Sequence, residues 1–396
     1  MRFASAVAAV GLWLVGSALS APRQESKAAD IKYNFVATNQ AIDLQNPDSL
    51  ARQPTDNGPV PNLKWSFSDS QTRTSNGAWA REQSIQDLPQ SNIAGAQEHM
   101  EKGTIQALHW HRFAEWGFVY KGRMLLSAVD ENGVYQTEEL NYGDIWYFPK
   151  GVAHTLQGLE DSNEYLIVLD DGDINRAGSI FHVDDWMSHT PKDILAKNFG
   201  VPESTFDFLP STHPYTVNGQ VSEKNVTGAV TPIASDNNSF VYRTLQHPPE
   251  KVGSHKGVVY KIDSTTFPRA KTIAATYVTL QPGGLRELHW HPNDAEWLYF
   301  HQGTARATVF IGNSNARTYN FMAGDIAAFP ENTGHYIENT GEGDLIFIEI
   351  FKSERVSDIS LTQWLALTPP DIVAQSLKVP IEFVESLKKN KQVFAG

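Results

Sequence analysis

The chain has 396 residues, of which 41% are hydrophobic and 19% are charged, and its formal net charge is -13. This length predicts two domains, because single hydrophobic cores stop growing at about 250–300 residues. The negative charge argues against nucleic acid or an anionic membrane surface as a partner, and the absence of cysteine excludes disulfides and thiolate ligands or nucleophiles.

Residues 1–20 are expected to form a signal peptide. Arg2 gives a positive start, an apolar stretch follows, and Ala18 and Ser20 are small residues at the positions that a signal peptidase reads. We favour a cleaved signal over a membrane anchor, because the apolar run is short and a span needs about 20 apolar residues. The sequence therefore predicts a secreted, extracellular protein.

Two polar segments flank or interrupt the rest of the chain. Residues 21–60 are rich in proline, asparagine and aspartate, which is typical of an extended N-terminal arm. Residues 206–237 are interpreted as an exposed linker. The sequons at Asn225 and Asn237 support this interpretation and predict a glycoprotein.

The remaining chain contains an internal duplication, which indicates two similar domains. The segment NYGDIWYFPKGVAH at residues 141–154 is echoed by MAGDIAAFPENTGH at residues 322–335, and residues 184–202 are echoed by residues 362–380. We therefore expect one domain over residues 61–205 and a second over residues 238–390.

Each copy is predicted to be built from strands. Short β-branched and aromatic runs alternate with turn signals, a pattern that favours an antiparallel sandwich or barrel. The runs LIVLDD and LIFIEIF are continuously apolar, as in buried strands. The end of each copy changes to helical spacing after a proline. The predicted fold class is all-β with minor helices, arranged as two tandem barrels.

Each copy contains the sequence LHWH, followed closely by a glutamate. Residues i and i+2 of a strand project from the same face, so the two histidines of each copy point together. The glutamate follows the second histidine after four residues in the first copy and after five in the second, a difference that one extra turn residue absorbs. These residues are His109, His111 and Glu115 in the first copy and His289, His291 and Glu296 in the second.

A third histidine, His154 or His335, lies 39 residues after the glutamate in both copies. Three neutral imidazoles and one carboxylate form a mixed nitrogen and oxygen donor set, which suits Mn or Fe and leaves coordination positions open for a substrate. A lone His-x-His is more often two ordinary strand histidines. The fourth donor at a fixed spacing, repeated in the second copy, favours a metal site in each copy instead.

The pattern H-W-H-x(3,4)-E followed by G-D-x(4)-P-x(4)-H resembles the two cupin motifs, and two such copies resemble a bicupin. The segments LRELHWH, GDIWYFP and HTPKDILAKNFGVP are similar to oxalate decarboxylases, including secreted fungal ones, over about residues 60–388. The resemblance implies two tandem cupin barrels, also called double-stranded β-helices or jelly rolls, which assemble into homo-oligomers. It also implies one Mn²⁺ in each barrel, held by the eight residues above, with oxalate and dioxygen as small-molecule partners.

The resemblance further implies an arginine three residues before the first histidine ligand, where a cation holds a small anion. Arg286 stands there in the second copy and Gln106 in the first. An acid must also deliver a proton to carbon. The resemblance makes Glu349 the candidate, fourteen residues after His335 in an apolar run, and the same count in the first copy reaches Val168.

Bacterial relatives carry their acid on a lid near the first site, and residues 170–181 match that lid here. This segment offers Arg176 and Ala177 where the relatives have a glutamate. Asp173 is the nearest acid, and Arg176 is a candidate for the missing anion-binding arginine. We therefore expect Arg286 and Glu349 to carry turnover in the second barrel, with the first barrel structural, weak or altered.

The resemblance favours Mn-dependent conversion of oxalate to formate and carbon dioxide. An oxalate oxidase, which gives carbon dioxide and hydrogen peroxide, is the main alternative, because the same site oxidises its substrate when no acid protonates the carbon. A flavonol dioxygenase is a second alternative, although it needs a large apolar pocket. A non-catalytic metal-binding bicupin is a third, and metal content per chain discriminates it.

Overall fold

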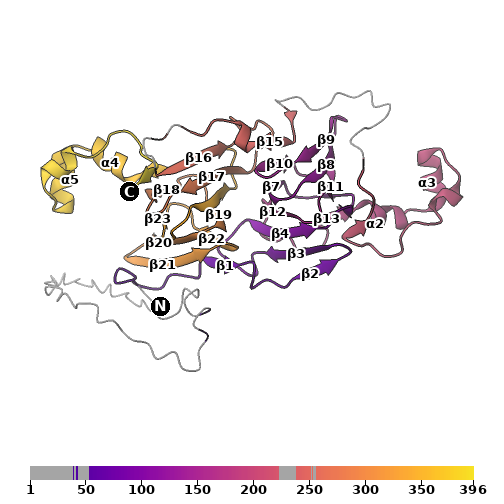
Figure 1. Cartoon of the computed structure of the whole chain (residues 1–396), viewed down its shortest axis with the longest axis horizontal. Coiled ribbons are helices and arrows are strands. Elements are labelled where there is room, and N and C mark those ends of the chain that lie inside the picture. The colour runs from indigo at the N-terminus through magenta and orange to yellow at the C-terminus, as the bar shows by residue number, and fades with distance from the viewer. Residues whose placement is uncertain (1–38, 40–41, 43–52, 223–237, 251, 253–255) are drawn as a thin grey trace, which may run out of the picture. The chain divides into compact units, whose positions relative to one another are not determined.

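A computed structural model of the chain describes residues 39, 42, 53–222, 238–250, 252 and 256–396 (Figure 1). The predicted signal peptide, most of the predicted arm and the asparagines of both sequons, Asn225 and Asn237, lie outside these residues, so secretion and glycosylation stay predictions. Among the helices that the structure describes, none is long and apolar enough to cross a membrane.

The first copy folds as two antiparallel sheets that share one hydrophobic core (Figure 1). One sheet runs in the order β15 (Val241–Arg243), β10 (Asp144–Phe148), β7 (Glu115–Lys121), β12 (Asn163–Leu169), β4 (Ala94–Met100), β3 (Ala78–Gln83) and β2 (Arg73–Ser75). The other contains β13 (Ile180–His182), β6 (His109–His111), β11 (Ala153–Gly158), β5 (Thr104–Gln106) and β14 (Thr216–Asn218), with β8 (Met124–Val129) pairing β11 and β9 (Tyr135–Leu140).

The second copy repeats this arrangement. One sheet runs in the order β1 (Lys64–Ser66), β22 (Asp325–Phe329), β19 (Glu296–Gln302), β24 (Leu345–Phe351), β17 (Ala274–Leu280) and β16 (Gly257–Ile262). The other contains β21 (Asn315–Met322), β20 (Thr304–Gly312), β23 (Gly334–Asn339), β18 (Leu285–Trp290) and β25 (Ile359–Ser360), with β26 (Phe394–Ala395) pairing β18. The prediction of an all-β fold with two tandem jelly-roll barrels is confirmed.

Short helices follow the last long strand of each copy, as the proline-led segments predicted. The side chain of Ser360 accepts a hydrogen bond from the backbone of Gln363 and so caps the first helix of the second group. Gly200 ends a helix of the first group in the left-handed conformation that glycine adopts without strain. The helices are α2 (Val183–Ser188), α3 (Lys192–Phe199) and the 3₁₀ turn η1 (Glu203–Phe206), then α4 (Leu361–Leu367), α5 (Pro370–Leu377) and α6 (Ile381–Glu385), with η3 (Thr244–Gln246) between the barrels.

Two strands pair with the barrel opposite to the one that the predicted boundaries give them, and a third lies within the predicted linker. Trp65 of β1 pairs with Ile326, so the first described strand of the chain extends a sheet of the second barrel. Tyr242 of β15 pairs with Ile145, which extends a sheet of the first barrel. Strand β14, inside the predicted linker, pairs with β5 of the first barrel. Each barrel is therefore completed by a segment from beyond its own predicted range.

The two barrels belong to one compact unit, residues 41–396, and share a core. Trp116 and Val168 of the first barrel pack in the same buried cluster as Trp297 and Ile348 of the second. The indole N–H of Trp297 donates to the side-chain oxygen of Gln83 at 3.0 Å. The sheet of each barrel that carries Glu115 or Glu296 thus buries its outer face against the other barrel.

Candidate metal centres

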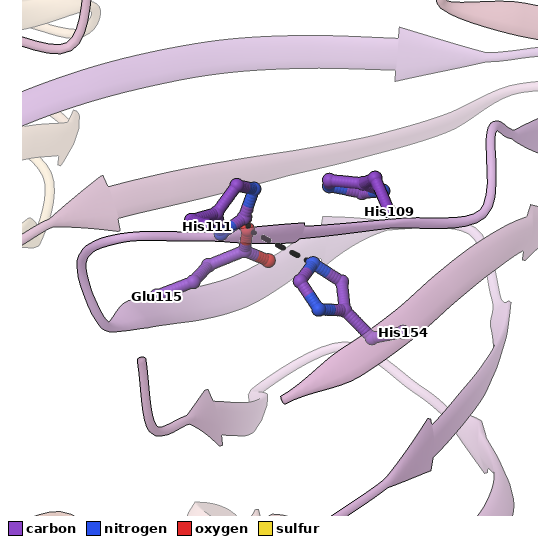
Figure 2. Close-up of side chains that lie close together, drawn as sticks. All are labelled: His109, His111, Glu115 and His154. Atoms are coloured by element: carbon purple, nitrogen blue, oxygen red, sulfur yellow. Dashed lines mark ion pairs between the residues drawn. The ribbon is translucent and has the colours of Figure 1, made fainter. Parts of the chain in front are cut away.

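Both predicted sets of four side chains come together, one set in each barrel. The potential ligand atoms of each set lie within 4.8 Å of one another, and all eight residues are buried. Figure 2 shows the first set, in which a dashed line joins the Glu115 carboxylate to the His154 ring. The sets are His109, His111, Glu115 and His154, and His289, His291, Glu296 and His335.

The strand register explains why residues far apart in sequence meet. His109 and His154 are directly paired across β6 and β11, and His289 and His335 are paired across β18 and β23. The glutamate of each set is the first residue of the next strand, β7 or β19. The connecting turn is one residue longer in the second copy, so the predicted compensation for the different spacing is confirmed.

The histidine rings are oriented by backbone carbonyls. In four of them Nδ1 lies 2.6–2.9 Å from the carbonyl oxygen two residues earlier, namely in His109, His154, His289 and His335. A carbonyl can only accept, so Nδ1 carries the proton and the lone pair stays on Nε2. His291 is held in the same way by the Ser357 carbonyl at 2.8 Å. Each of these five rings therefore offers Nε2 as a metal ligand.

Burial favours the neutral form of four of the six imidazoles. It lowers the pKa of His109, His111 and His289 well below the usual value. Burial also lowers the pKa of His291 to about 4, although the nearby Glu296 carboxylate opposes the shift. Neutral rings at mildly acidic and neutral pH are the form that binds a metal ion.

The second set contains buried polar atoms that a cation would satisfy. Among the described residues, Nε2 of His289, His291 and His335 and both carboxylate oxygens of Glu296 have no hydrogen-bond partner. His335 Nε2 lies 2.7 Å from a Glu296 oxygen, but not in hydrogen-bonding geometry. Buried polar atoms without partners are costly, so the donor set fits a metal ion.

The first set fits a cation as well. Glu115 accepts a hydrogen bond from the Trp146 indole at 2.8 Å through one oxygen. Its other oxygen lies 3.6 Å from Nε2 of His154 and 3.7 Å from Nε2 of His111. Three nitrogens and one oxygen thus converge here too, and an octahedral ion would keep open positions.

Arg286 and Glu349 form a buried ion pair beside the second set. Arg286 lies three residues before His289 on β18 and is 3% exposed, and Glu349 on β24 is 0% exposed. The Nε of Arg286 donates to Glu349 at 3.1 Å, and its Nη2 donates to Asp358 at 2.7 Å. The Thr276 hydroxyl donates to the other Glu349 oxygen at 2.5 Å. The two predicted helper residues, separated by 63 positions, therefore meet.

One nitrogen of the Arg286 guanidinium has no hydrogen-bond partner among the described residues. Burial alone would lower the pKa of Arg286, but the carboxylates of Glu349 and Asp358 outweigh burial and raise it, so the side chain stays cationic. After burial, the Arg286 charge is the next cause of the lowered pKa of His289, which reflects how near the two groups lie. Within the described part of the chain, Nη1 of Arg286 has no hydrogen-bond partner. It is thus available to a bound anion.

The first barrel lacks this pair. Gln106 takes the position of Arg286 and donates to the Tyr215 hydroxyl at 2.8 Å. The position of Glu349 is taken by Ile167. Glu349 pairs with Thr276 and Leu298, and Ile167 pairs with the two residues at the equivalent positions, Ala96 and Gly117. Counting along the sequence pointed to Val168, which is one residue off, since the turn before this strand is one residue longer in the second copy.

Neither Arg176 nor Asp173 of the predicted lid lines the cavity at the first metal site. Arg176 pairs with Asp171 at 3.1 Å and is half exposed, so it does not replace the missing arginine. The backbone of Asp173 donates to the Asp171 side chain in the same turn. Ile174 and Asn175 of this segment line a cavity above the first metal site instead.

Sequence reasoning missed Glu98, a buried carboxyl in the first barrel. Glu98 is 4% exposed and accepts hydrogen bonds from Tyr165 at 2.7 Å and Tyr215 at 2.9 Å. Burial is the main cause that raises its pKa from 4.5 to about 7. The strand period could have identified it: in AGAQEHM, Glu98 shares one face of the strand with Ala94, Ala96 and Met100, which all pack in the first barrel core.

Glu98 is expected to make stability depend on pH. Its folded pKa is raised, so its contribution is fully present below the unfolded pKa near 4.5 and is lost as pH rises through about 7. Relative to Glu98→Gln, the wild-type chain should lose about 2–3 kcal/mol of unfolding free energy between pH 5 and pH 8. Calorimetric unfolding of both proteins at the two pH values measures this, and a constant difference would contradict it.

Comparison with known proteins gives a consistent result. The cupin family profile matches residues 66–206 and 243–385. A probable oxalate decarboxylase of Arthroderma benhamiae is 55% identical over 90% of this chain and 88% of its own length. Oxalate decarboxylase OxdC of Bacillus subtilis is 41% identical over 93% of this chain and 95% of its own length.

Solved structures agree with these relatives. A structure of oxalate decarboxylase from Bacillus subtilis at pH 4.6 matches with a TM-score of 0.87 and 39% identity, covering 94% of this chain and 96% of that one. A second structure of that enzyme, with a TM-score of 0.86 and 40% identity over 94% of this chain and 98% of that one, was used to study its Mn(II) centres.

Proposed function

This chain belongs to the cupin family and, within it, to the two-barrel oxalate decarboxylases, and we propose that it converts oxalate to formate and carbon dioxide with Mn²⁺ in each barrel. The reaction consumes one proton, which must reach the carbon that becomes formate. A bound Mn²⁺ supplies a redox-active Lewis acid with open positions for oxalate and dioxygen. The chain must supply the ligands, the anion-binding group and the proton.

We propose that turnover takes place in the second barrel. The observation that carries this assignment is the buried Arg286–Glu349 pair, which lies beside the second metal site and has no counterpart beside the first. The free Nη1 of Arg286 is suited to hold an oxalate carboxylate and polarise it. Arg286 is fixed by two carboxylates, so little reorganisation is needed when the substrate binds.

Glu349 is proposed to move the proton. Its two oxygens accept hydrogen bonds from Arg286 and Thr276, which orient the carboxylate within the barrel. Phe351 pairs with the metal ligand Glu296, so these two side chains project from the same face of the sheet. Glu349 lies two residues before Phe351 on β24, so it projects from that face as well, on the same side as Glu296. A carboxylate held there can take the proton from bound oxalate and return it to carbon.

The alternatives are less well supported. The relatives that match most of the chain are named oxalate decarboxylases, and a positioned acid favours formate over peroxide. The cavity beside Arg286 and Glu349 has a volume of 280 Å³ and is lined by several charged side chains, which is unlike the apolar pocket that a flavonol requires. Two complete buried ligand sets disfavour a non-catalytic protein.

A product assay tests the proposed function. Mn-loaded protein given oxalate should release formate and carbon dioxide in equal amounts, with hydrogen peroxide as a minor product. Chelation of the metal should abolish turnover and Mn²⁺ should restore it, because the chain alone offers no redox centre. Formate and peroxide measured in the same reaction decide the outcome: peroxide in place of formate would favour the oxidase, and neither product would favour a non-catalytic role.

A further inference from the structure

The first barrel contains a cavity of about 390 Å³ that reaches its metal site. Two of the metal ligands, His111 and Glu115, form part of its wall. Most of the remaining wall is apolar, and the volume is in the range that holds a drug-sized organic molecule. Its apolar lining residues are Ala78, Trp79, Ala80, Ala96, Ile167, Leu169, Ile174 and Ile180.

Glu98 also lines this cavity and is the acidic group that distinguishes it from the second barrel. Strands β4 and β17 correspond, so Glu98 takes the place of Val278. In the second barrel the carboxylate is Glu349 on β24, bonded by Thr276 from β17. In the first barrel the carboxylate is Glu98 on β4, the counterpart of β17, and it accepts a hydrogen bond from Tyr165 on β12, the counterpart of β24.

The charges around the two sites differ accordingly. In the second barrel, Glu349 and Asp358 are balanced by Arg286 and Lys391. Among the described residues that line the first cavity, the one cation is Arg73, which is exposed and pairs with Glu82. No cation is therefore left to balance a second negative charge on a ligand. The titratable groups that act on Glu98 or share its cavity are Tyr165, Tyr215, Glu115, Arg73, His111 and Glu82.

This charge balance defines the ligand class, given the proposed metal in the first barrel. A divalent ion with one carboxylate and three neutral imidazoles keeps a single net positive charge, which one oxygen anion neutralises. A dianion such as oxalate would leave a net negative charge in a low-dielectric site whose described lining offers no cation to balance it. The apolar walls favour a ligand with a hydrophobic body.

We propose that the first barrel binds a monoanionic organic acid with an apolar body, held beside the metal by the protonated carboxyl of Glu98 instead of by an arginine. The protonated carboxyl donates a hydrogen bond to the ligand, whereas the ionised form repels it. The first site is thus a second binding site with its own selectivity, and the divergence between Gln106 and Arg286 marks a change of ligand.

Binding of benzoate to the Mn-loaded full chain, measured by titration calorimetry, tests this proposal. Benzoate is an anion at both pH 6 and pH 8, while a carboxyl with a pKa of about 7 passes from mostly protonated to mostly ionised. Wild-type affinity should therefore fall about tenfold between these pH values. Glu98→Gln should bind benzoate within about threefold of wild type at pH 6 and lose most of the pH dependence, because its amide stays a neutral donor.

Two further variants separate the sites. Arg286→Lys should weaken oxalate binding and leave the pH dependence of benzoate binding in place. Gln106→Arg, which restores the missing cation, should add oxalate binding at the first barrel even if Glu98→Gln does not fold. Absence of benzoate binding, retention of the pH dependence in Glu98→Gln, or its loss in Arg286→Lys would overturn the proposal.

The outcome does not depend on whether the second barrel turns over oxalate. Benzoate binding with the expected pH dependence in a protein that makes no formate would refute the proposed activity and support this inference. Formate production by a Mn-loaded chain that shows no benzoate binding would support the proposed activity and refute this inference.

Discussion

Replacing Arg286 by lysine is expected to lower kcat/KM for oxalate by about 10²–10³-fold, the range seen when one preorganised donor is removed from an active site. The guanidinium bonds Glu349 and Asp358 through two nitrogens and leaves a third for the substrate. Lysine keeps the charge but offers a single ammonium on a flexible stem, so it cannot make these three bonds in a fixed geometry. Steady-state formate production at several oxalate concentrations measures the effect.

Arg306→Lys is the matched control for this substitution. Arg306 lies on β20 of the same barrel and donates to Asn320 at 3.0 Å at the protein surface. Its replacement should change kcat/KM by less than about twofold, since it touches neither the ligands nor the pair. If Arg286→Lys also stayed within twofold, the anion-binding role of Arg286 would be wrong.

Glu349→Gln is expected to lower kcat for formate by about 10²–10⁴-fold, which is the usual contribution of a positioned acid or base. Glutamine keeps the shape and can still accept from Arg286, but its amide cannot take up and return a proton. The fraction of product that appears as hydrogen peroxide should rise, because the carbon is no longer protonated promptly. Formate and peroxide are quantified in the same reaction.

Glu338→Gln provides the control for the loss of a carboxylate. Glu338 lies on β23 of the second barrel and is only partly buried. This variant should keep both the rate and the product ratio of wild type. A Glu349→Gln protein that binds Mn²⁺ and makes formate at the wild-type rate would exclude Glu349 as the proton carrier.

The metal ligands could be predicted from the sequence because their geometry is local. The spacing of His109 and His111 is a strand period, and the repetition in the second copy confirms that spacing within one chain. The pairing of His109 with His154 requires only that two strands adjoin in an antiparallel sheet. Eight positions therefore followed from two short motifs.

The surroundings of the ligands depend on contacts that the motifs do not encode. Asp358 and Thr276 reach Arg286 and Glu349 from separate elements, so no sequence spacing reveals them. Ile167, and not Val168, occupies the position of Glu349 because a turn of different length shifts the register by one residue. A shift of one residue moves a side chain to the other face of the strand. Residue counting across a turn of unequal length cannot detect this shift.

The exchange of short strands between the barrels could not be predicted from the sequence either. Strands β1 and β15 have three residues each, too few to show a periodic pattern. Their positions follow from the shared core, which includes Tyr242 and, at its edge, Trp65. Burial at the interface between two domains is a tertiary effect, and it places these two strands in the barrel on the other side of the predicted boundary.

We expect the second barrel to carry turnover. The most direct measurement compares metal content and formate production in His111→Ala and His291→Ala, with unfolding curves to verify that both fold. Each variant should lose most of one of its two Mn²⁺ ions. Formate production should fall to background in His291→Ala and persist in His111→Ala. Loss of formate in His111→Ala, with activity retained in His291→Ala, would contradict the assignment.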